Sequence, residues 1–197
     1  MIAAGSFINP HVTQRNSRAR SIVIGLTTGR ETNQRLNSLI KELAVSIPNS
    51  RITRRGKSSK EELTSRFLED GFTHALVAYR WHGGPGRLDF FNVKPTGMEH
   101  VPPSAILQLV TLRREFGEHS AHKVSAITCE QVSKTTRRLG RVLSTVLELP
   151  LLESGHDLPC SLHLRENGEV TEVVVRSLVN MRDLGPKLAI SKLVWSV

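Results

Sequence analysis

The chain has 197 residues, of which 39% are hydrophobic and 23% are charged, as in an ordinary soluble globular protein of one or two domains. Its two cysteines, Cys129 and Cys160, exclude a disulfide framework, so we expect a reducing compartment: the cytoplasm, or the nucleolus if the source is eukaryotic. No apolar run approaches the roughly 20 residues that cross a bilayer, and we expect no signal peptide.

Positive charge gathers in one segment. The chain has 27 Lys and Arg against 18 Asp and Glu, a net charge of +9. The segment from Arg15 to Lys60 contains eleven of the cations and two acids, Glu31 and Glu42, so it accounts for the whole excess. A confined basic patch concentrates polyanions near the protein. This pattern favours a nucleic-acid partner over an ordinary solvated charged face.

Aromatic residues are scarce, with six Phe, two Trp and one Tyr. A protein that stacks successive unpaired bases needs an aromatic platform, which this composition does not supply. We therefore expect recognition mainly of the shape and backbone of a nucleic acid.

The first half of the chain predicts two strand–helix units after a loose basic arm at residues 1–17. Capping boxes at Thr28-x-x-Glu31 and Ser59-x-x-Glu62 predict the two helix starts, and Pro48 and Gly71 end these helices. A basic turn is expected at Arg55-Gly56-Lys57. Short apolar or β-branched runs predict strands at 21–26, 51–54, 72–79 and 87–93.

The second half is expected to begin after a proline-rich connection at 94–103. The spacing of Ile106, Leu109, Val110 and Leu112 predicts a helix over 104–116. A third capping box, Thr128-x-x-Gln131, predicts a helix that continues to Leu147. The remaining strands are expected at 124–128, 161–165, 170–176 and 187–194, with turns at Asn167-Gly168 and Gly185-Pro186.

Two of these helices resemble each other at an offset of 100 residues. The matching pairs are Leu39 and Leu139, Leu43 and Leu143, Ile47 and Leu147, and Lys41 and Arg141. Amphipathic helices also resemble each other by chance. The repeat nevertheless predicts an α/β fold of two similar halves, each with a strand–helix–strand plan and a mixed sheet, at about residues 18–100 and 104–197.

The cations of the basic segment are the candidate phosphate ligands. In the first half they are Arg30, Lys41, Arg51, Arg54, Arg55, Lys57 and Lys60. In the second predicted helix of the repeat, Lys134, Arg137, Arg138 and Arg141 share one face and form a weaker set. Either Arg35 or Arg51 could instead pair with an acid inside the fold. Helix geometry directs Arg35 away from the face of Arg30 and Lys41.

Several of these motifs resemble one known family. They are Thr27-Thr28-Gly29-Arg30, Pro48-Asn49-Ser50, Arg55-Gly56-Lys57-x-Ser59, Glu62-Leu63 and, near the end, Asp183-Leu184-Gly185-Pro186-Lys187-Leu188. In order and spacing they resemble the Brix-domain family of ribosome-assembly proteins, over about residues 18–197. The likeness is greatest to archaeal stand-alone members related to the family's small-subunit rRNA processing factor. Gly29 stands where many members have serine, and Lys187 where many have arginine.

The resemblance implies a fold and a function. Each half would be similar to the anticodon-binding domain of class II aminoacyl-tRNA synthetases. The protein would be a monomer that binds rRNA or precursor rRNA during ribosome biogenesis and assists its processing and folding, without catalysis or a cofactor. Other ribosome-assembly or ribosomal proteins would be further partners, and Lys187 would be a further RNA contact.

Three other functions are weaker interpretations of the same sequence. In a protein-interaction scaffold, the basic face would dock an acidic partner within a pre-ribosomal complex. A nuclease would need clustered aspartates, but the four in this chain are scattered, and neither a phosphate-binding loop nor a nucleophile elbow is present. His119-x-x-His122 with Cys129, and His156 with Cys160-x-x-His163, do not have the spacing of a standard zinc module. We therefore expect no metal site and no catalytic residue.

Overall fold

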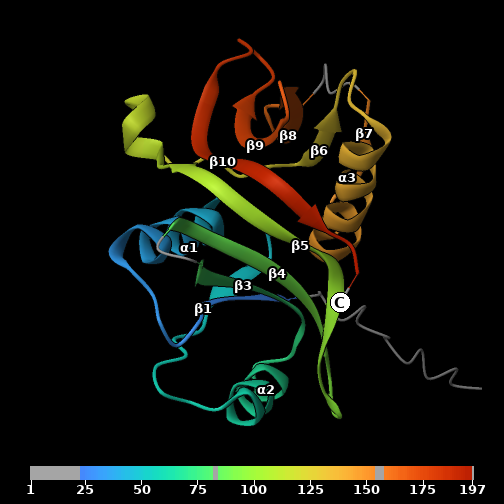
Figure 1. The fold of residues 1–197 in the computed structure, drawn as a ribbon. Helices are drawn as coiled ribbons and strands as arrows, with labels where there is room; N and C mark the ends of the chain where they lie inside the picture. The colour runs from blue at the N-terminus through green and yellow to red at the C-terminus, as the bar shows by residue number, and fades with distance from the viewer. Residues whose placement is uncertain (1–22, 82–83, 154–157, 197) are drawn as a thin grey trace, which may run out of the picture.

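The computed structural model describes residues 23–81, 84–153 and 158–196 (Figure 1). Within this part of the chain, no helix is both long and apolar enough to cross a membrane. The elements of the first half are β1 (Val23–Thr28), α1 (Gln34–Ser46), β2 (Ser50–Ile52), α2 (Lys60–Glu69), β3 (Phe72–Trp81), β4 (Gly84–Lys94) and β5 (Gly97–Thr111). After a 3₁₀ helix, η1 (Arg113–Phe116), follow β6 (Ala126–Cys129), α3 (Lys134–Leu147), β7 (Leu151–Leu152), β8 (Cys160–Asn167), β9 (Val170–Ser177) and β10 (Asp183–Val194).

All of these strands form one mixed sheet in the order β2-β1-β3-β4-β5-β10-β9-β8-β6-β7. The second half repeats the strand order of the first from the other edge of the sheet: β7-β6-β8-β9-β10 corresponds to β2-β1-β3-β4-β5. The pairings agree, since β1 is parallel to β2 and β3, and β6 is parallel to β7 and β8. The two halves meet where β5 and β10 pair antiparallel. The predicted α/β fold of two similar halves is therefore confirmed.

Helices α1 and α3 cover the same face of the sheet. Leu39 and Leu43 of α1 and their counterparts Leu139 and Leu143 of α3 are all at most 5% exposed and belong to one apolar core. Burial of each such side chain contributes about 2 kcal/mol. Gly140 lets α3 approach the sheet, because a Cβ at this position would lie 2.8 Å from Cys129 Sγ.

Helix α2 covers the opposite face of the first half, where Leu63 and Phe67 pack with Phe72 and Phe91 in a second apolar cluster. The connections explain this arrangement. The chain passes from β1 through α1 to β2, and then through α2 to β3, on the other side of β1. Because such crossovers are right-handed, moving in opposite directions along the sheet places the two helices on opposite faces.

The starts of α1 and α3 differ from prediction. Thr28 is the last residue of β1, and the cap of α1 is Asn33, whose Oδ1 accepts a hydrogen bond from Leu36 N at 2.9 Å. Thr128 lies within β6, and the cap of α3 is Ser133. The two caps keep the 100-residue offset, so the predicted repeat is confirmed, whereas the capping boxes predicted at Thr28 and Thr128 were wrong. The box at Ser59 and Glu62 is confirmed at the start of α2.

Residues 94–111 also differ from prediction. The expected connection and helix are instead the turn after β4 and the long strand β5, and only Arg113–Phe116 are helical. Gly185-Pro186 lies inside β10 and not in a turn before it. The predicted hairpin of β8 and β9 is confirmed. The basic arm predicted at residues 1–17 lies outside the described residues. Because β5 pairs with β4 as β10 pairs with β9, we propose that the first half extends through β5.

Candidate nucleic-acid interface

A crevice of about 380 Å³ lies beyond the carboxyl ends of β1 and β2. Its floor is formed by Thr27 and Thr28 of β1, one wall by Asn37 and Lys41 of α1, and the other by Ile52–Gly56. At this point the connection after β1 leads to α1 on one face of the sheet, whereas the connection after β2 leads to α2 on the other face. Open α/β sheets commonly bind ligands at such switch points, because two loops diverge there and leave a cleft.

The crevice contains polar groups that the fold leaves available. Thr27 Oγ1 is buried and has no hydrogen-bond partner among the described residues. Lys41 and Arg54, which also line the crevice, are exposed. A buried hydroxyl is normally hydrogen-bonded, so the unpaired Thr27 Oγ1 beneath the crevice departs from the usual pattern. The crevice therefore combines positive charge with a polar floor, as an anionic ligand requires.

Three arginines organise the loop beside the crevice, and each of them donates a hydrogen bond to Ser58. Nε of Arg30 and Nε of Arg55 each donate to Ser58 O at 3.4 Å. Arg66 of α2 donates to Arg54 O at 3.2 Å and also bonds Ser58 Oγ. Arg66 was not among the residues predicted from the sequence. Its position seven residues after the Ser59 cap, two helical turns along, was the signal that could have placed it near this loop.

Most of the predicted first-half cations remain exposed. Arg30, Lys41, Arg51, Arg54, Lys57 and Lys60 are exposed, and Arg55 is half-buried. Within residues 23–81, 84–153 and 158–196, no carboxylate oxygen lies within 4.0 Å of their charged nitrogens. Arg35 differs, as expected: its Nη2 lies 2.7 Å from Glu115 Oε2.

The ring of Tyr79 packs against Gly29, at the start of the loop between β1 and α1. Burial raises the pKa of its hydroxyl, with Asp89 adding to the effect, so the group stays protonated at neutral pH. The guanidinium of Arg87 lies 4.9 Å from the ring centroid. Gly29 packs against the same ring, since a Cβ there would lie 2.7 Å from Tyr79 Cδ1. The start of the β1–α1 loop is thereby fixed next to the crevice.

The second predicted set lies on the outer surface of α3, but its side chains diverge. Arg137 Nη1 lies 2.7 Å from the exposed Glu153, whereas the guanidinium of Arg138 lies 3.9 Å from the ring centroid of Trp195. Lys134 and Arg141 are exposed. Because surface ion pairs are weak, Arg137 can still exchange its partner for a phosphate.

Lys187 has a different environment from the other predicted contacts. Its Nζ lies 3.2 Å from Glu172 Oε1, and Glu172 is 5% exposed. Arg165 also pairs with Glu172, so the two cations neutralise one buried carboxylate and lower its pKa against the effect of burial. This contact uses the charge of Lys187 within the fold, and we leave Lys187 out of the proposed interface.

Cys129 and His163 are enclosed by the fold. Burial raises the pKa of Cys129 to about 11, which keeps the thiol protonated. His163 is buried beside Thr128 and Ser161, and burial lowers its pKa. Among the described residues, no group of three His, Cys, Asp or Glu side chains is arranged to hold a metal ion. His156 lies outside the described residues.

Comparisons with known proteins give a distant sequence relative and solved structures of the same fold. No family model matches the chain. A probable Brix domain-containing ribosomal biogenesis protein of Pyrococcus horikoshii is 26% identical over 158 residues, which cover 77% of this chain and 70% of the relative.

Two solved structures share the fold. The probable ribosomal biogenesis protein of Aeropyrum pernix K1 superposes with a TM-score of 0.71 at 20% identity, over 87% of this chain and 96% of that one. Mil, an archaeal Imp4-like protein, superposes with a TM-score of 0.60 at 20% identity, over 87% of this chain and 99% of that one. The further likeness to anticodon-binding domains stays a prediction. The expected resemblance to Brix-domain proteins is confirmed, through a distant sequence relative and through the fold.

Proposed function

We propose that this protein is a ribosome-biogenesis factor that binds rRNA or precursor rRNA through the crevice beyond β1 and β2. It acts by binding, without catalysis, and holds RNA segments in an arrangement that favours processing and folding. The names of the Pyrococcus and Aeropyrum relatives support the biological setting. The observation that carries the proposal is the set of exposed first-half cations, none of which has a carboxylate partner in the described residues.

The charge and the position of the cations that line the crevice support phosphate binding. Phosphates are bound by Lys and Arg that are exposed and close enough to act together. Lys41 on α1 and Arg54 after β2 come from separate elements but line one crevice. Arg55 also lines the crevice, and Arg30, in the loop after β1, donates to Ser58 O in the loop that contains Arg55. An RNA backbone that enters the crevice would therefore meet cations on both sides.

Two double variants test the proposal. Lys41→Ala with Arg54→Ala removes two cations from the crevice, whereas Lys94→Ala with Lys123→Ala removes the same charge elsewhere. We expect the first pair to weaken binding of an rRNA fragment at least tenfold and the second pair to weaken it much less. Equal losses would mean that only net charge matters, and would contradict a site at the crevice. An acidic protein that displaces the RNA from this face would favour the scaffold function.

A further inference from the structure

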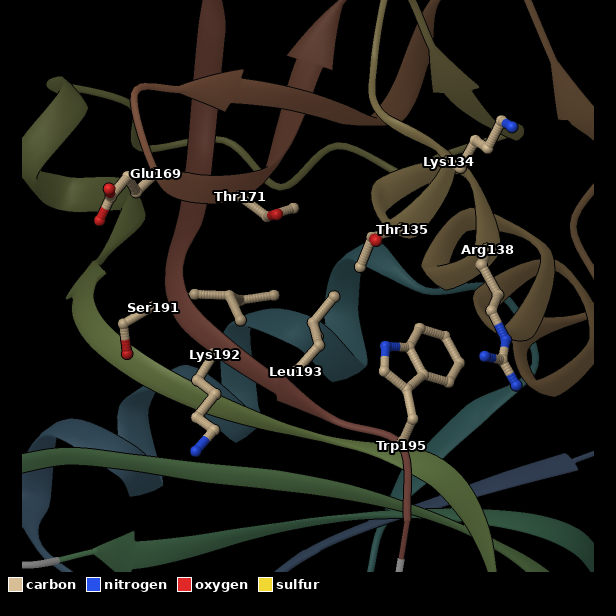
Figure 2. Close-up of a pocket in the computed structure, with 10 residues that line it drawn as sticks. Lys134, Thr135, Arg138, Glu169, Thr171, Ser191, Lys192, Leu193 and Trp195 are labelled. Carbon is tan, nitrogen blue, oxygen red and sulfur yellow. The ribbon is translucent and has the colours of Figure 1, made fainter.

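A second cavity, of about 540 Å³, lies between α3, the turn of the β8–β9 hairpin and the end of β10 (Figure 2). Its lining includes Lys134 and Arg138 from α3, Glu169 from the hairpin turn, Lys192 from β10, and Trp195. The volume is in the range of sites that hold small molecules. This cavity is separate from the crevice beyond β1 and β2, and no residue lines both.

One aromatic side chain stands out in this cavity. The guanidinium of Arg138 lies 3.9 Å from the centroid of the Trp195 ring, and Figure 2 shows the two side chains extending toward one another. A stacked guanidinium holds the indole in one orientation and adds a cation–π attraction. Aromatic rings and guanidinium planes are the groups on which proteins stack unpaired bases. A fixed indole at the edge of a cavity is therefore a suitable stacking surface.

Charged side chains of both signs line the cavity. Lys134, Arg138 and Lys192 supply three cations, and within the described residues none of them has a carboxylate partner within 4.0 Å. The acidic residue, Glu169, lies across the cavity from Arg138 in Figure 2. Cations beside an aromatic ring suit a nucleotide, which combines an anionic phosphate with a flat base.

The repeat shows that this chemistry is special to the second half. The helix positions that correspond to Lys134 and Arg138 at the 100-residue offset are Gln34 and Ser38, which are uncharged. In the first half, the nearby Arg35 instead donates from Nε to Val110 O at 2.9 Å. The two cations that α3 contributes to this cavity therefore have no charged counterparts at the matching positions of α1.

We propose that this cavity binds one unpaired RNA nucleotide, whose base stacks on Trp195 while Lys134, Arg138 and Lys192 contact the adjoining phosphates. The inference rests on the proposed function and sharpens it, because it specifies single-stranded RNA as the ligand at this site. The crevice contacts the backbone of any segment, whereas the cavity requires an extruded base.

Fluorescence of Trp195 tests the inference directly. The chain has two tryptophans, so the Trp81→Phe variant reports on Trp195 alone. We expect a short single-stranded RNA to quench this fluorescence, and an abasic ribose-phosphate oligomer of equal length to leave it nearly unchanged. Equal quenching by both oligomers, or quenching by neither while both bind, would overturn the inference.

Affinity gives a second, independent readout. Trp195→Leu is expected to weaken binding of the single-stranded RNA roughly 5- to 150-fold, which is the usual effect of losing one stacked base. Trp195→Phe, which keeps a ring, is expected to retain most of the affinity, and binding of the abasic oligomer should not change. Unchanged RNA affinity in Trp195→Leu would overturn the inference while leaving the crevice proposal intact. If the unaltered protein bound neither oligomer, the proposed function itself would fail.

Discussion

Arg35 on α1 binds Glu115 in η1, with 2.7 Å between Nη2 and Oε2. Its Nε also donates to Val110 O at 2.9 Å, so one side chain joins α1 to the end of β5. Within the described residues, the other cations of the same basic segment have no carboxylate partner. The segment thus contains two kinds of arginine, one that stabilises the fold and others that are free to bind a ligand.

This difference gives a stability prediction. Arg35→Ala should lower the free energy of unfolding by about 1–2 kcal/mol, because it removes a partly exposed ion pair and a hydrogen bond to a backbone carbonyl. Arg51→Ala should change it by less than about 0.5 kcal/mol, since Arg51 is exposed. Urea denaturation of both variants measures the contrast. Similar losses in the two variants would show that the exposed cations also serve the fold.

Gly29 gives a second stability prediction. A Cβ at this position would lie 2.7 Å from Tyr79 Cδ1, so Gly29→Ala must displace a half-buried ring. We expect a loss of about 1–3 kcal/mol by thermal or chemical denaturation. The control is a double-mutant cycle with Tyr79→Leu. The cost of Gly29→Ala should shrink when the ring is absent, and an undiminished cost would locate the strain elsewhere.

The buried imidazole of His163 predicts a dependence of stability on pH. Burial lowers its pKa from the ordinary value of 6.5, with Arg176 adding to the effect. Since the unfolded state then binds the proton more readily, the stabilisation is complete above the unfolded pKa and is lost as the pH falls below it. We therefore expect the free energy of unfolding to decrease from about pH 7.5 to about pH 5.5.

His163→Gln provides the comparison for that measurement. The variant removes one of the titrating groups, so its stability should depend less on pH in the same window. Part of the dependence should remain, because burial also lowers the pKa of His74. A variant with the same pH dependence as the unaltered protein would exclude His163 as a source of it.

The repeat could be predicted from the sequence because it is a local pattern that occurs twice. Leu39 and Leu139 face one core on helices of the same period. Strand β5 could not be predicted in this way. Its buried residues include Ala105, Leu107 and Val110, followed by Leu112, because register shifts against β10 interrupt the alternation. The resulting mixture of two- and three-residue spacings resembles a helix, although Leu109, assigned to the buried side, is 50% exposed.

The candidate sites were predictable to different degrees. The confinement of positive charge to one segment indicated the first-half cations as candidate phosphate ligands, because residues close in sequence stay close in the fold. The contact between Arg138 and Trp195 joins residues 57 positions apart, and it exists because β10 ends beside α3. The pairing of Lys187 with Glu172 likewise depends on neighbouring strands. Periodicity and capping motifs describe one helix or strand at a time, so they do not predict contacts between side chains of different elements.

The dependence of RNA affinity on salt tests the central claim most directly. If about six cations around the crevice each neutralise a phosphate, the logarithm of the binding constant should fall linearly with the logarithm of salt concentration, with a slope of roughly −4 on single-stranded RNA to −5 on duplex. Lys41→Ala with Arg54→Ala should make this slope shallower by between one and two. A binding constant that hardly changes with salt would contradict the account.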